Sequence, residues 1–212
     1  MDRAKDFTNR IGGWWTGVRF HYDEAPEIDK RAEPMRFCEA VAGARRKTVT
    51  LVPELVNCPG ARRSLGWADG GDDELVRAMA EKAGRPAGLI RDLVFDTPRL
   101  RSRPRAVTLG DVEQPDVIVS FMQAEAAMRL ALLWEDHTGG SLSVNLPSSM
   151  AVCGNVAVRA YLTERLCLSV GCPDSRAHGG IGRDQLVVGL PVELARELAQ
   201  GASRRPVASQ PA

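Results

Sequence analysis

The chain has 212 residues, of which 44% are hydrophobic and 26% are charged, and its formal net charge is +1. This length allows one substantial core, and the composition is that of a globular domain. The balanced charge gives no reason to expect nucleic acid as a partner. No apolar run is long enough for a transmembrane helix, and the charged N-terminus lacks a signal-peptide pattern, so we expect a cytoplasmic protein without membrane contact.

Hydrophobic patterning predicts strands and helices that alternate along the chain. We expect loose termini at 1–10 and 203–212, and a single domain at 11–202. Strands are predicted at 14–20, 48–52, 93–95, 106–109, 116–121, 141–146, 166–170 and 185–190. Helices are predicted at 36–46, 72–83, 122–134, 151–162 and 191–200, and the helix at 122–134 should be buried because it is apolar on most faces. This alternation indicates an α/β or α+β fold with helices packed on a mixed sheet.

Two segments of the chain resemble each other around their cysteines. CEAVAGARRKTVTLVPELVNCPGAR spans 38–62 and CGNVAVRAYLTERLCLSVGCPDSR spans 153–176. Each contains a cysteine, a helical stretch, a strand and then Cys-Pro-x-x-Arg, with 19 and 18 residues between the paired cysteines. Such a repeat indicates an internal duplication, and we expect two halves that share one core and are related by an approximate two-fold axis.

The duplication predicts that four cysteines meet near the axis, as equivalent residues do in a two-fold interface. They are Cys38, Cys58, Cys153 and Cys172. Cysteines of a reducing compartment are more often metal ligands, catalytic thiols or core residues than disulfides. Four thiolates that face one another would form a metal site. Cys167 has leucine-rich apolar neighbours on a predicted strand, and we interpret it as a core residue.

The spacing of these cysteines favours an iron–sulfur cluster, most simply of the 4Fe–4S type, over zinc. Structural zinc sites usually contain close pairs such as C-x2-C, and the sequence has none. Ligands that come singly from different segments suit a cluster, which is wider than one zinc ion. Zinc remains the alternative metal.

Three further residues are candidates for contact with the cofactor. Arg62 and Arg176 each follow a Cys-Pro pair by the same number of residues, and their guanidinium groups could donate to cluster sulfides or hold an anionic substrate. The structural alternative is that they close helix ends. Ser175 lies in a glycine-rich stretch whose backbone could supply donors to an anion.

The same residues carry a resemblance to a known family. The chain resembles the prokaryotic family called domain of unknown function 169. The resemblance rests on the segments FCEAVAGARR, NCPGARRSLG and MQAEAAMRL, the Ala-x-Cys of AVCGN, and SVGCPDSRAHGGIGRDQLVVGLP. The resemblance covers roughly Trp14 to Glu193. It implies a shared fold and cysteines at the four positions named above, but it implies no reaction.

We therefore expect an iron–sulfur protein that transfers electrons or acts as a cluster-dependent enzyme on a small molecule. Its expected partners are a small molecule or a redox protein, and self-association is left open. One alternative is a metal-free thiol enzyme with Cys58 or Cys172 as the nucleophile. The other is a zinc-stabilised binding module that performs no catalysis.

Overall fold

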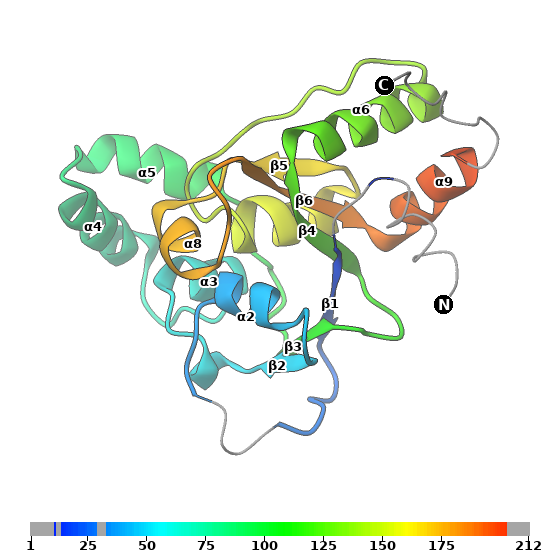
Figure 1. The fold of residues 1–212 in the computed structure, drawn as a ribbon. Coiled ribbons are helices and arrows are strands. Elements are labelled where there is room, and N and C mark those ends of the chain that lie inside the picture. The colour runs from blue at the N-terminus through cyan, green and yellow to red at the C-terminus, as the bar shows by residue number, and fades with distance from the viewer. Residues whose placement is uncertain (1–10, 12–13, 29–32, 203–212) are drawn as a thin grey trace.

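The computed structural model describes residues 11, 14–28 and 33–202 (Figure 1). The predicted loose termini lie outside these residues. In the described part of the chain, six strands form one sheet in the order β2–β3–β1–β4–β6–β5. The strands are β1 (Thr16–His21), β2 (Val49–Leu51), β3 (Ala106–Gly110), β4 (Val117–Gln123), β5 (Cys167–Ser169) and β6 (Gln185–Pro191).

All neighbouring strands of this sheet pair antiparallel. The predicted layered α/β fold is confirmed, and the sheet is antiparallel throughout rather than mixed. The two central strands, β1 and β4, pair from Thr16 opposite Val119 to Val18 opposite Val117. The strands that precede Cys58 and Cys172, β2 and β5, lie at opposite edges. The two-fold relation between the halves stays a prediction.

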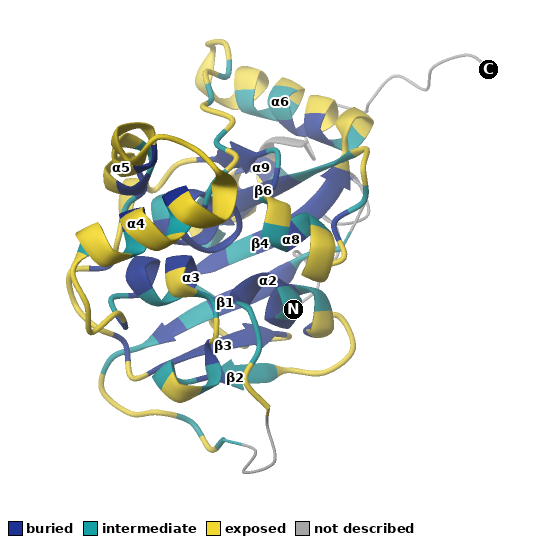
Figure 2. Ribbon diagram, turned by 90° about the vertical axis from the view of Figure 1, so that its left-hand side faces the viewer, coloured by how far each residue is buried: buried dark blue, intermediate teal, exposed yellow. Residues whose placement is uncertain are grey.

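Helices cover both faces of the sheet. The α-helices are α2 (Phe37–Gly43), α3 (Pro59–Ser64), α4 (Asp72–Ala83), α5 (Ala87–Asp96), α6 (Ala124–Thr138), α7 (Arg159–Thr163), α8 (Pro173–His178) and α9 (Val192–Ala202). A 3-10 turn, η1 (Pro53–Leu55), precedes α3, and a π-helical segment, η2 (Cys153–Val158), leads into α7. Helices α2, α3 and α8 lie on one side of the sheet, whereas α9 lies behind it in the same view (Figure 2).

Alternation along β4 shows how the sheet separates two cores. Val117, Val119 and Phe121 pack into the cluster that contains α2, α3 and η2. Ile118 and Met122 point to the opposite face and pack with α6 and α9. Successive side chains of a strand point to opposite faces, so one strand supplies both cores. Cys38 and Cys153 belong to the first cluster, and Cys58 packs against it.

Two predicted strands are wrong. Residues 93–95 lie inside α5, where Ile90 and Val94 are buried one helical turn apart. Residues 141–146 form no strand. Short apolar runs of this kind fit a helix or a strand equally well, and tertiary contacts decide between them.

The long helix also differs from its prediction. It begins at Ala124 rather than at Met122, which belongs to β4. Its buried residues are Ala127 and Leu130, whereas Met128 and Leu132 are about half exposed. The helix covers the sheet with one face only, so the prediction of a buried helix is wrong. No helix in the described ranges has the length and apolar character needed to cross a membrane.

Candidate metal-binding site

The four cysteines of the duplicated segments occupy the starts of four helical elements. Cys58 and Cys172 are the N-caps of α3 and α8, and a proline follows each at the first helical position. Proline suits this position because its missing N–H would have no partner inside the helix. Cys38 is the second residue of α2, and Cys153 is the first residue of η2. The Cys-Pro sequence therefore builds the same strand–loop–helix corner twice.

The four thiols are electrostatic neighbours of one another. Cys153 is influenced by Cys58, Cys172 and Cys38. Cys38 is influenced by Cys172 and Cys58, and Cys58 by Cys172. Every pair among the four thus interacts, although their segments are separated by up to 134 residues along the chain. The tertiary structure gathers the sulfur atoms of both repeats in one region.

Backbone N–H groups near the sulfur atoms favour the charged forms of the thiols. The amides of Ala61 and Gly60 lower the pKa of Cys58 in this way, and the amide of Glu39 lowers that of Cys38. The amide of Gly154 acts likewise on Cys153, and the amide of Ser175 donates to Cys172 Sγ at 3.4 Å. Such bonds stabilise the charged form of a thiol and orient the sulfur, as they do around metal-bound thiolates.

Burial nevertheless keeps at least three of these thiols protonated in the absence of a metal. Burial and the neighbouring Cys172 and Cys58 raise the pKa of Cys38 to about 12. Burial likewise raises the pKa of Cys58, and it raises the pKa of the fully enclosed Cys153 well above its usual value. An uncompensated thiolate is costly in an apolar environment, so loss of the proton requires a cation nearby.

The arrangement is a set of neighbouring thiols rather than a closed cage. Within the described ranges, no three His, Cys, Asp or Glu side chains form a group that could hold one metal ion. Cys167 stands apart from the set, because its electrostatic neighbours are Thr163 and Arg159 and its Sγ contacts the carbonyl of Arg165. The fifth cysteine is buried in β5, as the sequence predicted.

Two glycines allow the helices that carry the cysteines to pack closely against neighbouring elements. A Cβ atom on Gly179, the residue after α8, would lie 2.9 Å from Cys38 Cβ and 3.3 Å from Cys38 Sγ. The backbone that ends α8 therefore rests directly on the thiol of α2. On α3, a Cβ on Gly60 would lie 2.6 Å from the side chain of Met150, which precedes η2. Two glycines thus permit the approach of α8 to α2 and of α3 to the start of η2.

The two arginines predicted to contact a cofactor bind backbone carbonyl groups. Arg62 donates to the carbonyl oxygens of Pro53 and Trp67 and pairs with Asp69. Arg176 donates to the carbonyl oxygens of Val170, Gly182 and Gln185. Both guanidinium groups thereby brace the loops around a Cys-Pro corner, and a contact with a cofactor stays a prediction.

Ser175 is also engaged at the cysteine. Its hydroxyl accepts from the backbone N–H of Cys172 at 2.8 Å and contacts the carbonyl oxygen of the same residue at 2.9 Å. Together with the bond from the Ser175 amide to Cys172 Sγ, these contacts form a capping box. Ser175 therefore positions Cys172 and its loop.

Sequence reasoning missed the residues that support the site. The backbone donors to sulfur and the glycine that contacts Cys38 carry no sequence signal beyond their place near a cysteine. The buried pair of Arg63 and Asp72, which fixes α3 to the start of α4, was also missed. The sequence shows Asp72 as the first residue of a predicted helix, but it gives no sign that Arg63 is the partner of Asp72.

Known proteins resemble the chain over nearly its whole length. The model of a family described as "Uncharacterised ArCR, COG2043" matches residues 16–201. The "Uncharacterized protein MJ0308" of Methanocaldococcus jannaschii is 22% identical over 188 residues, which cover 84% of this chain and 81% of that protein. No solved structure matches.

Proposed function

The chain belongs to the DUF169 family, and from this premise we propose that it is an iron–sulfur protein whose cluster is held by Cys38, Cys58, Cys153 and Cys172. The observation that carries the proposal is that these four thiols, which come from four separate segments, lie near enough for neighbours in the set to raise the pKa of Cys38, Cys58 and Cys153. A set of four thiolates is the usual ligand set of 2Fe–2S and 4Fe–4S clusters. Ligands that come singly favour a cluster over zinc, and we propose 4Fe–4S as its type.

The surroundings of the thiols support a soft, electron-rich group. Backbone amides favour the charged forms of Cys38, Cys58 and Cys153, and the amide of Ser175 donates to Cys172 Sγ. Hydrogen bonds to sulfur are one of the means by which proteins set cluster potentials. Buried thiols give up their protons when a cation binds, so metal binding should be coupled to proton release. A bound cluster would supply one-electron transfer. The protein would then act with a redox partner or on a small molecule.

The metal-free thiol enzyme is the weaker explanation of the same residues. A thiol nucleophile must be ionised near neutral pH, and catalytic cysteines have lowered pKa values. Burial instead raises the pKa of Cys58, which was one of the two candidate nucleophiles. Among the described residues, the groups that shift the pKa of Cys58 are backbone amides, Cys172 and Asp174, and no histidine is among them.

The test is the metal content of the full chain purified without oxygen. We expect absorption near 400 nm and about four iron atoms and four acid-labile sulfides per chain. Serine replacements of Cys38, Cys58, Cys153 and Cys172, each made singly, should lower the iron and sulfide content. Cys167→Ser is the matched control, since this thiol is buried as Cys38 and Cys153 are but lies outside the set.

Three results would contradict the proposal. A colourless protein with about one zinc per chain would support the binding module instead. A metal-free protein in which one cysteine alkylates far faster than the others would support the thiol enzyme. Loss of iron from Cys167→Ser as large as that from the four other variants would show that the ligand set is wrong.

A further inference from the structure

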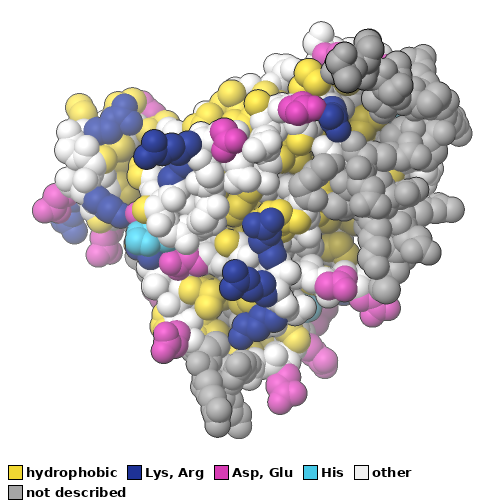
Figure 3. All heavy atoms as spheres, viewed as in Figure 1, with side chains coloured by type: hydrophobic (Ala, Val, Ile, Leu, Met, Phe, Trp, Pro, Cys, Tyr) yellow, Lys and Arg dark blue, Asp and Glu magenta, His cyan; other side chains and the backbone are white. Residues whose placement is uncertain are grey.

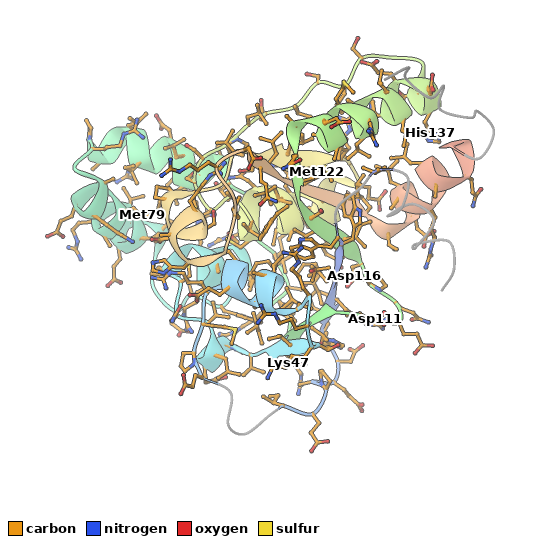
Figure 4. The ribbon with its side chains drawn as sticks, in the orientation of Figure 1. Lys47, Met79, Asp111, Asp116, Met122 and His137 are labelled. Atoms are coloured by element: carbon orange, nitrogen blue, oxygen red, sulfur yellow. The ribbon has the colours of Figure 1, made fainter. Side chains whose placement is uncertain are left out.

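A cavity lies at the end of β4, apart from the four thiols. Its volume is about 320 Å³, close to the lower limit of about 300 Å³ for small-molecule sites. Its apolar lining includes Trp14, Phe121 and Met122, and Figure 4 shows Met122 beside the start of α6. The rings of Trp14 and Phe121 meet edge to face, with centroids 5.5 Å apart. The cavity thus has a firm aromatic side.

The lining of this cavity carries an excess positive charge. Its charged lining residues are Arg45, Arg129 and Glu125. Arg129 is paired with Glu125 at 2.5 Å, which neutralises both. Arg45 lies over the Trp14 ring, 4.0 Å from its centroid, and has no carboxylate partner among the described residues. The lining therefore keeps one uncompensated cation, and basic side chains gather over the same region as α2 in Figure 3.

Polar donors complete the lining. Gln185 accepts the backbone N–H of Gly182 through its Oε1 atom, which leaves its amide NH2 group as a donor. Gln123 gives its own NH2 group to Asp184. One guanidinium and one amide thus stand beside an aromatic wall, a combination that matches a carboxylate attached to a flat apolar group.

We propose that this cavity binds a small aromatic or similarly flat carboxylate, with Arg45 holding the carboxylate and Trp14 and Phe121 contacting the apolar part. A single free cation matches a single negative charge, so a monoanion fits better than a phosphate ester. Cys38 is the second residue of α2, whereas Arg45 lies two residues beyond its last residue, Gly43. The site is distinct from the thiols, and its occupancy does not depend on a cluster.

Calorimetric titration of the full chain with benzoate tests this proposal. Benzamide serves as the neutral probe of the same shape, and acetate as the anion without an apolar group. We expect benzoate to bind at least about tenfold more tightly than either, because charge-assisted hydrogen bonds are roughly twice as strong as neutral ones. Equal affinity for benzoate and benzamide, or no binding of benzoate at millimolar concentration, would overturn the assignment.

Two variants locate the bound probe. Arg45→Gln should lower benzoate affinity about tenfold, while Arg46→Gln, its exposed neighbour outside the cavity, should bind as the unmodified protein does. Benzoate should also change the tryptophan fluorescence, and Trp14→Phe should abolish that change. A loss in Arg46→Gln equal to that in Arg45→Gln, or a signal that persists in Trp14→Phe, would place the probe elsewhere. None of these readouts involves iron, so their failure would leave the cluster proposal untouched.

Discussion

Arg63 on α3 and Asp72, the first residue of α4, form a two-bonded ion pair inside the protein. Arg63 Nε lies 2.9 Å from Asp72 Oδ1, and Arg63 Nη2 lies 3.1 Å from Asp72 Oδ2. Arg63 also donates to the carbonyl oxygen of Thr97 at 2.7 Å, and its side chain is only 5% exposed. Since Cys58 caps α3, the pair fixes one cysteine corner to the α4–α5 hairpin.

We predict that Asp72→Ala lowers the free energy of unfolding by about 3 kcal/mol, because it leaves a buried guanidinium without its counterion. Urea denaturation measures this loss. Asp73→Ala is the matched control in the same helical turn, since Asp73 is 76% exposed and pairs with the exposed Arg91. It should cost less than about 1 kcal/mol. Equal losses in the two variants would show that the Arg63–Asp72 pair stabilises the fold no more than an exposed ion pair does.

Gly179→Ala should disturb the thiol of Cys38. The added methyl group would lie 2.7 Å from the carbonyl oxygen of Ser175 and 2.9 Å from Cys38 Cβ, so α8 must move away from α2. We expect a loss of about 1–3 kcal/mol in unfolding free energy and a lower iron content after reconstitution. Gly43→Ala, on α2 with no atom within 4 Å of the added group, should be neutral or slightly stabilising. Unchanged iron content in Gly179→Ala would contradict the expected displacement.

Arg176→Lys and Arg176→Gln separate two roles of this residue. If Arg176 acts by donating several hydrogen bonds to backbone carbonyl groups, lysine cannot replace its planar guanidinium group. The free energy of unfolding should then fall by about 1–3 kcal/mol in both variants. Both should then also bind less iron, because the loop of Cys172 moves. If the charge alone matters, lysine should retain the iron that glutamine loses. Chemical denaturation and iron analysis of the pair decide between these outcomes.

His21 should make the stability of the protein depend on pH. Burial, then the nearby Arg19, lowers the pKa of His21, against the opposite effect of Asp116. The unfolded chain therefore takes up a proton near pH 6.5 that the folded chain binds only at lower pH. We expect the unfolding free energy to fall as pH drops below about 6.5. Urea denaturation at pH 7.5, 6.5 and 5.5 should show a weaker dependence in His21→Gln, and an identical dependence would contradict the assignment.

The paired Cys-Pro-x-x-Arg segments were readable from the sequence because their information is local. Proline after cysteine and a helical pattern after proline are short-range signals, and the structure places Cys58 and Cys172 at the starts of α3 and α8. Interior strands of the sheet, such as β3 and β4, were also predicted, since apolar runs with β-branched residues are typical of buried strands.

Other features depended on partners distant in the chain. The order of the strands, the pairing of Arg63 with Asp72 and the cavity beside Arg45 each join segments whose patterns carry no mark of one another. The same reason explains the error at 93–95, where contacts of α5 with α4 and the core favour a helix over a strand for a short apolar run. The spacing of the cysteines along the chain determined which cysteines of the two similar segments are equivalent. Only the packing of the helices on the sheet decided that their sulfur atoms are neighbours, because that proximity comes from long-range contacts.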